Sequence, residues 1–132
     1  MDFAYPYAAL GTVLVILVYI WTGMMVTRAR KVHGVIHPDT AGAPAFNRIW
    51  RAHMNTLEAL PQFLPAMWLF ALVISDCWAG LLALLWAVGR VLYVRGYAVE
   101  AGKRSFGFGV SLLATAVGLF GAAGVIVAQL LS

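Results

Sequence analysis

A run of polar and ionisable side chains interrupts the apolar stretch between residues 45 and 74. It contains Arg48, Arg51, Asn55 and Glu58. At about 100° per residue in a helix, these four positions fall within an arc of roughly 80°. They therefore lie on one helix face, where arginine and asparagine can donate hydrogen bonds to an anion and glutamate can accept them from a cation.

A second polar set occupies residues 77 to 104. Its members are Arg90, Tyr93, Tyr97, Glu100 and Arg104, of which the first four cover a similar arc. Thirteen uncharged residues precede Arg90, so this arginine lies well inside an apolar segment. A charge within a membrane span costs at least ~2.5 kcal/mol on insertion scales, so it normally faces a partner or a wet cavity. Glu58 lies at a similar depth, and it is the partner that we expect for Arg90.

Arginine outnumbers the acidic residues in this part of the chain. Five arginines are expected to converge where only one or two carboxylates are available: Arg30, Arg48, Arg51, Arg90 and Arg104. This surplus indicates an anionic guest, because guanidinium groups bind carboxylates through paired hydrogen bonds. The alternative is that the charged groups only join helices through buried ion pairs. That alternative stays open for Arg90 and Glu58.

The rest of the sequence indicates what kind of protein carries these residues. Of its 132 residues, 63% are hydrophobic and 11% are charged, whereas about 25% are charged in soluble domains. Residues 3–27 and 105–132 are uncharged stretches of 25 and 28 residues, and about 20 such residues suffice for a helix to cross a bilayer. The composition excludes a soluble enzyme, a disordered chain and a nucleic-acid-binding module. We predict an all-α integral membrane protein.

Hydropathy predicts a single domain, residues 1–132, built as a bundle of four transmembrane helices. The expected spans are residues 5–26, 45–74, 77–100 and 105–131. Ser75 and Asp76 form a tight turn, and the glycines and prolines of residues 32–44 predict an irregular loop. We expect the first span to be a retained helix rather than a signal peptide, because no Lys or Arg precedes it.

The basic residues predict the orientation in the membrane. Apart from Arg90, they all lie in segments 28–51 and 95–104. Positively charged loops stay in the cytoplasm, so we expect both termini on the non-cytoplasmic side. Short loops and the preference for arginine over lysine favour a bacterial inner membrane, with the endoplasmic reticulum membrane as the alternative.

No metal site is expected. His33 and His37 are four residues apart, but Gly34 and Pro38 oppose a helix that would bring their rings together. Cys77 is the only cysteine, which excludes a cysteine cluster. We interpret it as a packing residue on the side away from the basic loops.

Two motifs resemble those of a known family. The first is Arg51-Ala52-His53-Met54-Asn55-Thr56-Leu57-Glu58, and the second runs from Arg90-Val91-Leu92-Tyr93 through Gly96-Tyr97 to Arg104-Ser105. Together with the four spans, they resemble the family of membrane-associated proteins in eicosanoid and glutathione metabolism (MAPEG). That family includes microsomal glutathione transferases, leukotriene C4 synthase and a microsomal prostaglandin E synthase. The resemblance covers nearly the whole chain.

The resemblance implies a homotrimer that binds glutathione, as a co-substrate, at the cytoplasmic side between neighbouring subunits. It also implies that Arg104 and Ser105 are catalytic and lie beside the glutathione thiol. The binding residues that follow from the resemblance and from the arginine surplus are Arg30, Arg48, Arg51, Asn55, Glu58, Arg90, Tyr93 and Tyr97. The chain departs from the leukotriene C4 synthase branch at Ala59, where that branch has a tyrosine.

We therefore expect a detoxifying glutathione transferase that acts on hydrophobic electrophiles, with reduction of lipid hydroperoxides as a side activity. Its partners would be glutathione, a hydrophobic or lipid-derived substrate, membrane lipids and further copies of the chain, and no nucleic acid. One alternative is a non-catalytic lipid-binding or adaptor member of the same family. Another is a subunit of a small transporter, which the lack of an internal repeat disfavours.

Overall fold

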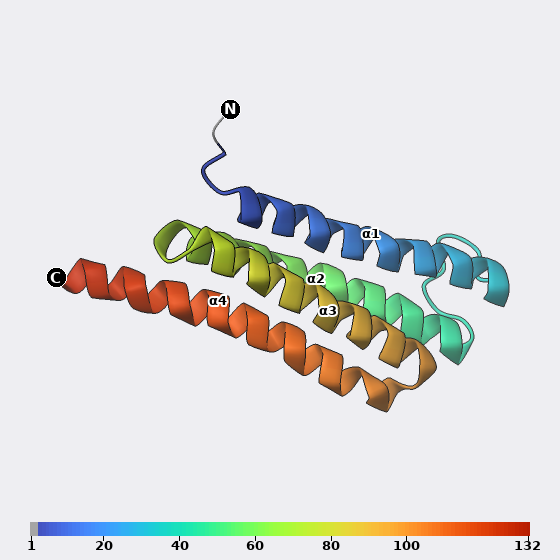
Figure 1. The fold of residues 1–132 in the computed structure, drawn as a ribbon. Helices are drawn as coiled ribbons and strands as arrows, with labels where there is room; N and C mark the ends of the chain where they lie inside the picture. The colour runs from blue at the N-terminus through green and yellow to red at the C-terminus, as the bar shows by residue number, and fades with distance from the viewer. Residues whose placement is uncertain (1–2) are drawn as a thin grey trace.

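The computed structural model describes residues 3–132, which form an antiparallel bundle of four long helices (Figure 1). The helices are α1 (Pro6–His33), α2 (Pro44–Val73), α3 (Asp76–Val99) and α4 (Ser105–Leu131), and a short 3-10 helix, η1 (Ala101–Arg104), precedes α4. All four long helices are long and apolar enough to cross a bilayer. The predicted all-α class and the four-helix bundle are thus confirmed.

The arrangement of the helices separates the two ends of the bundle. α2 and α3 each pack against the three other long helices, and α1 and α4 flank them on the outside (Figure 1). Residues 3 and 132 lie at one end, which we call the terminal end. The loop of residues 34–43 and η1 lie at the opposite end (Figure 1), which we call the arginine-rich end.

The boundaries of α1 and α2 follow from local chemistry. α1 continues past the expected end of its span at Val26 and reaches His33, with two further basic residues in its last turn, where positive charge interacts favourably with the helix dipole. Gly34 then ends the helix with a φ of 66°, a left-handed conformation that glycine adopts without strain. α2 begins at Pro44, whose fixed φ suits the first position of a helix.

Large side chains fill the middle of the bundle, and small ones allow the helices to approach. Phe63 of α2 stacks on Trp86 of α3 with ring centroids 5.2 Å apart, and both are fully buried. Three small residues in a row on α4 are also buried: Ala114, Gly118 and Ala122. A Cβ added at Gly118 would lie 3.5 Å from the backbone of Ala66 in α2. This row therefore brings α4 against α2 within one chain, as small residues do in membrane proteins.

Glycines bring α3, η1 and α4 into direct backbone contact at the arginine-rich end. A Cβ added at Gly107 would collide with the backbone nitrogen of Tyr93, and one added at Gly96 would collide with the carbonyl oxygen of Lys103. Only glycine fits at either position without movement of a backbone. These glycine contacts consequently hold η1 and the start of α4 against the last turns of α3.

Asp76, the first residue of α3, closes the terminal end. Its carboxylate accepts hydrogen bonds from the backbone N–H groups of Tyr7 (3.1 Å) and Ala8 (2.8 Å), which belong to the N–H groups left free at the start of a helix. Ser75 caps α3 by accepting from the N–H three residues later. Cys77 is exposed in the single chain, so it does not pack inside the four-helix bundle.

Candidate functional site

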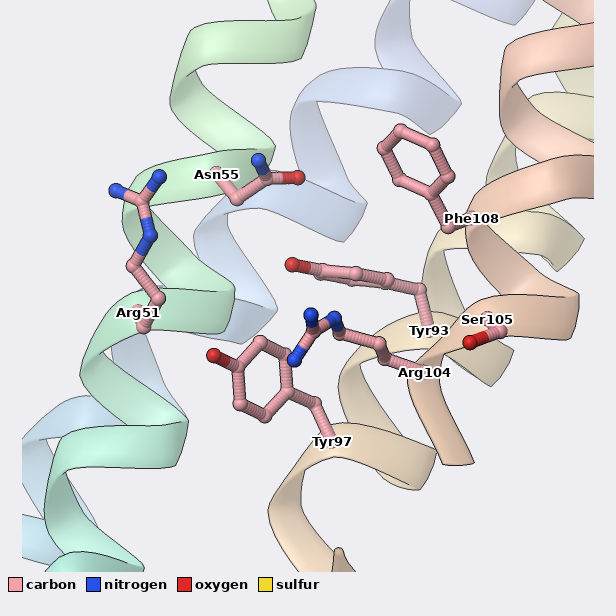
Figure 2. Close-up of a pocket in the computed structure, with 7 residues that line it drawn as sticks. All are labelled: Arg51, Asn55, Tyr93, Tyr97, Arg104, Ser105 and Phe108. Carbon is pink, nitrogen blue, oxygen red and sulfur yellow. The ribbon is translucent and has the colours of Figure 1, made fainter. Parts of the chain in front are cut away.

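A pocket of about 410 Å³ lies between α2, α3 and α4 at the arginine-rich end. The residues that line it are Arg51, Asn55, Tyr93, Tyr97, Arg104, Ser105 and Phe108 (Figure 2). Its volume is within the range of about 300–1,000 Å³ that small-molecule sites occupy. All of these residues except Phe108 belong to the set that the sequence proposed, so packing brings six candidate residues to one cavity.

Arg51 and Asn55 form the α2 wall of the pocket. Nη1 of Arg51 lies 3.2 Å from Oε1 of Glu58, and the two side chains are 54% and 50% exposed. A pair this exposed contributes only about 0–1 kcal/mol, so a ligand carboxylate can compete for Arg51. The expected pairing of Glu58 with Arg90 is wrong, because Arg51 lies two turns away on the same helix and reaches Glu58 along that face.

Tyr93 and Tyr97, one turn apart on α3, form an aromatic wall. Their rings meet edge to face with centroids 5.7 Å apart. The ring centroid of Phe108 in α4 lies 6.3 Å from that of Tyr93. Both phenol oxygens point toward α2 in Figure 2, so this wall offers two hydroxyl groups to the cavity. Phe108 was not among the residues expected from the sequence, although its position four residues after Arg104 places it on the same helix face.

The third wall comes from η1 and the first turns of α4. The guanidinium carbon of Arg104 lies 5.0 Å from the centre of the Tyr97 ring, a cation–π contact, and the group extends between the two tyrosine rings (Figure 2). Within residues 3–132, Arg104 has no carboxylate at ion-pair distance. The Ser105 hydroxyl donates to the carbonyl of Gly102 over 3.3 Å, and the N-terminus of α4 adds partial positive charge.

Arg90 lies behind this cavity rather than in its lining. The residue is 4% exposed, and its Nη1 donates to Oδ1 of Asn55 over 2.8 Å. Arg90 therefore touches the pocket lining from behind, through its hydrogen bond to Asn55 and its cation–π contact with the ring of Tyr93.

The two remaining candidate arginines also lie outside the lining. Arg30 is buried, donates to the carbonyl of Asp39 over 2.7 Å and lies over two aromatic rings of α2. Nε of Arg48 donates to the carbonyl of Ala98 over 3.4 Å. Within one chain, these arginines hold the loop of residues 34–43 and the end of α3. The structure therefore does not bring all five arginines to one place.

His53 faces α1 instead of the pocket. Its Nδ1 lies 2.7 Å from Oγ1 of Thr22, and its ring stacks on Tyr19 with centroids 5.0 Å apart. The Thr22 hydroxyl donates its only hydrogen to the carbonyl of Tyr19, so the hydroxyl must accept from Nδ1–H of His53. His53 thereby joins α2 to α1.

The lining has the chemistry of a site for a polar anionic ligand. It combines two guanidinium groups, an amide, two phenols and a hydroxyl, and these groups donate hydrogen bonds to carboxylate, carbonyl or thiolate acceptors. Two carboxylates are close to the lining in sequence: Glu58 is bound to Arg51, and Glu100 is paired with Lys103. Within residues 3–132, the lining of this pocket thus holds two guanidinium groups and no carboxylate.

Comparison with known proteins identifies relatives that share most of this chain. The profile of the MAPEG family matches residues 8–124. An uncharacterised protein of Synechocystis sp. is 40% identical over 114 residues, which are 86% of this chain and 83% of that protein. Human microsomal glutathione S-transferase 2 is 35% identical over 103 residues, 77% of this chain and 70% of the relative. Leukotriene C4 synthase of Cavia porcellus is 36% identical over 93 residues, 70% of this chain and 62% of the relative.

The family match extends from α1 into α4. It therefore includes every residue that lines the pocket, and it confirms the resemblance inferred from the two motifs. With four helices that can span a bilayer, the chain is an integral membrane protein and belongs to the MAPEG family.

Proposed function

We propose that this protein is a membrane-bound glutathione transferase that joins glutathione to hydrophobic electrophiles. The observation that carries the proposal is the excess of donors in the pocket, where Arg104 has no carboxylate partner among residues 3–132 and Arg51 has only an exposed one. Glutathione carries two carboxylates, one ammonium and one thiol, so its acceptors complement these donors. The similarity to human microsomal glutathione S-transferase 2 supports the same ligand.

The positions of the side chains support a division of roles within the pocket. Arg51, Asn55 and the two tyrosines would hold the peptide part of glutathione. Glu58 would exchange its bond to Arg51 for one to the ammonium group. Arg104 and Ser105, at the start of α4, would face the sulfur and act as the catalytic residues. Arg30 and Arg48 do not line the pocket, so we assign them to holding the loop and the end of α3.

The chemistry requires the thiolate form of glutathione. A free thiol has a pKa near 8.5, so only a small fraction is ionised at neutral pH. The guanidinium group of Arg104 and the N-terminus of α4 would stabilise the anion after its proton leaves to water. The sulfur then forms a bond to the electrophilic carbon, and a halide or an epoxide oxygen leaves that carbon with the bonding electrons.

The same thiolate supports the side activity on lipid hydroperoxides. It would attack the terminal peroxide oxygen and release the lipid alcohol. A second glutathione would then displace hydroxide from the sulfur, so that two glutathione molecules become one disulfide and the hydroperoxide becomes an alcohol and water. Both reactions remove reactive apolar compounds, which is the basis for proposing a role in detoxification.

Assembly as a homotrimer is part of the proposal. Arg51, Arg104 and Phe108 line the pocket and are exposed in the single chain, so a neighbouring subunit can cover the open side. We place the arginine-rich end in the cytoplasm and both termini outside it, because basic segments stay cytoplasmic. The bacterial inner membrane is the membrane that we propose.

Glutathione titration and a conjugation assay test the proposal directly. Purified protein in detergent is titrated by calorimetry, and conjugation of an aryl halide is followed by absorbance. The wild type should bind glutathione saturably and form the conjugate. Arg104→Ala should lower the conjugation rate by about 10²–10³-fold, the effect of removing one donor from a developing anion, with an unchanged melting temperature.

Arg95→Ala is the matched control, because it removes an exposed arginine of α3 that does not line the pocket. It should leave binding and rate unchanged. A wild type that is well folded yet fails to bind glutathione would show that the proposed function is wrong. Binding without conjugation would favour a non-catalytic member of the family, and a full rate in Arg104→Ala would remove Arg104 from the mechanism.

A further inference from the structure

Arg90 is a charged residue buried in a membrane-spanning helix without an acidic partner. It is 4% exposed, and within residues 3–132 no carboxylate lies at ion-pair distance. Its Nε is buried without a hydrogen-bond partner. The guanidinium carbon lies 4.9 Å from the ring centre of Tyr93 and 5.6 Å from that of Trp86, which compensates only part of the charge. An arginine in this setting is unfavourable for folding. We therefore look for its role in ligand binding rather than in stability.

The hydrogen bond from Arg90 determines how the Asn55 amide is turned. A guanidinium group only donates, so the atom that it contacts at 2.8 Å must be the amide oxygen, Oδ1. The Nδ2 group of Asn55 then points away from Arg90. Asn55 lines the cavity and extends from α2 toward the aromatic wall (Figure 2). Arg90 thus occupies the acceptor of the amide, which leaves Nδ2, with its two hydrogens, as the group that Asn55 can offer to a ligand.

The charge on Arg90 also strengthens those donors. A hydrogen bond from an ionised donor is stronger than a neutral one, and it polarises the amide that accepts it. Without Arg90, the Asn55 amide could rotate and present its oxygen to the cavity. That oxygen would repel a carboxylate or a carbonyl of a bound ligand.

We propose that Arg90 is a positioning residue that turns the Asn55 amide, so that Nδ2 donates to an oxygen of glutathione. This inference rests on the proposed function and deepens it. It assigns Arg90 no contact with glutathione, because the residue does not line the pocket. It also explains why an unpaired charge is retained in the bundle: the charge serves the ligand at the expense of stability.

A purely structural role for Arg90 predicts different behaviour. If the residue only joined α3 to α2, its replacement would lower stability and leave glutathione affinity alone. If it positions Asn55, Arg90→Met should keep or raise the melting temperature, because an unpaired buried charge is replaced by an apolar side chain of similar length. The same variant should raise KM for glutathione and leave kcat within about twofold.

A double-mutant cycle tests the positioning role. Glutathione affinity is measured by calorimetry for the detergent-solubilised wild type, Arg90→Met, Asn55→Ala and the double variant. Each single change should weaken binding about tenfold, the value of one charge-assisted hydrogen bond. The double variant should bind within about twofold of Asn55→Ala, because Arg90 acts through a group that is already missing. Arg95→Met, on the exposed side of the same helix, should change nothing.

Asn55→Asp keeps the test decisive if Arg90→Met does not fold. The new carboxylate would form an ion pair with Arg90, which supports folding, and it has no hydrogens to donate. It should weaken glutathione binding at least as much as Asn55→Ala. Wild-type affinity in Asn55→Asp would overturn the inference.

The cycle also distinguishes this inference from the proposed function. Fully additive losses, or a lower melting temperature of Arg90→Met at unchanged affinity, would overturn the positioning role while glutathione binding by the wild type stands. No binding by the wild type would overturn the proposed function and this inference together.

Discussion

At the terminal end of the bundle, Asp76 and Ser75 find partners within the chain, whereas at the arginine-rich end, within residues 3–132, the cationic side chains outnumber the carboxylates that pair with them. Asp76 accepts from two N–H groups at the start of α1, and Ser75 caps α3. At the opposite end, Arg104 has no carboxylate partner among residues 3–132, and Arg51 shares Glu58 in an exposed pair.

This difference separates residues that stabilise the bundle from residues that serve a ligand. A polar group paired within the chain contributes to the folding free energy, but a free donor contributes only when a ligand binds. Substitutions at the terminal end should therefore lower stability and spare glutathione binding. Substitutions in the pocket, such as those of Arg104 and Asn55 above, should do the reverse. The following changes test this division.

Gly107→Ala should lower both stability and activity, because this residue packs α4 against α3 and lies close to the pocket. Its Cβ would collide with the backbone nitrogen of Tyr93, so α4 would have to move away from α3 together with Ser105. We expect a loss of about 3 kcal/mol in the free energy of unfolding, as for overpacked sites, together with a lower conjugation rate. Unfolding of the protein in mixed micelles by added SDS, and the aryl halide assay, measure the two effects.

Gly109→Ala is the control for Gly107→Ala. Gly109 lies on the same helix, and nothing stands within 4 Å of an added Cβ. The free energy of unfolding of this variant should therefore rise by about 0.5–1 kcal/mol, from the helix preference of alanine alone. Equal stability of the two variants would contradict the close contact of α3 with α4.

Asp76→Ala should affect stability alone. Two backbone N–H groups of α1 lose a charged acceptor, which we expect to cost about 2 kcal/mol for a site that is half exposed. The glutathione dissociation constant should stay within twofold. Asp76→Asn retains one oxygen acceptor, and about half of the loss should return. Weakened glutathione binding at unchanged stability would mean that the terminal end also serves the ligand.

Lys103→Ala should have the smallest effect and sharpen the role of its neighbour Arg104. The Lys103–Glu100 pair spans 3.8 Å, with side chains 61% and 68% exposed, so its loss should cost less than about 0.5 kcal/mol. The conjugation rate should be unchanged, because Lys103 does not line the pocket. A rate as low as that of Arg104→Ala would show that the pocket needs general positive charge rather than one guanidinium group.

The sequence predicted the long helices well, because a bilayer imposes a minimum length on any uncharged stretch that crosses it. The expected span at residues 45–74 corresponds to α2 at Pro44–Val73. The sequence did not predict η1 or the extension of α1 to His33. Both lie beyond the apolar stretches, where close backbone contacts and charges near helix ends determine the structure.

The identities of the pocket residues were also accessible from the sequence, but their pairings were not. Helical periodicity places Arg51 and Asn55 on one face, and packing brings both to the pocket. The choice of Glu58 as partner for Arg90 failed because periodicity leaves the rotation of α3 relative to α2 undetermined. Phe108 was missed for the same reason, since its contact with Tyr93 depends on how α4 meets α3.

By itself, the sequence determined that this chain is a four-helix membrane protein with its basic residues gathered at one end, because these properties depend on composition and order along the chain. Only the tertiary structure decided which of those residues have partners. Contacts between side chains of different helices depend on helix rotation and on glycine contacts such as that of Gly107. That packing places Arg90 behind Asn55 and leaves Arg104 free to meet a ligand.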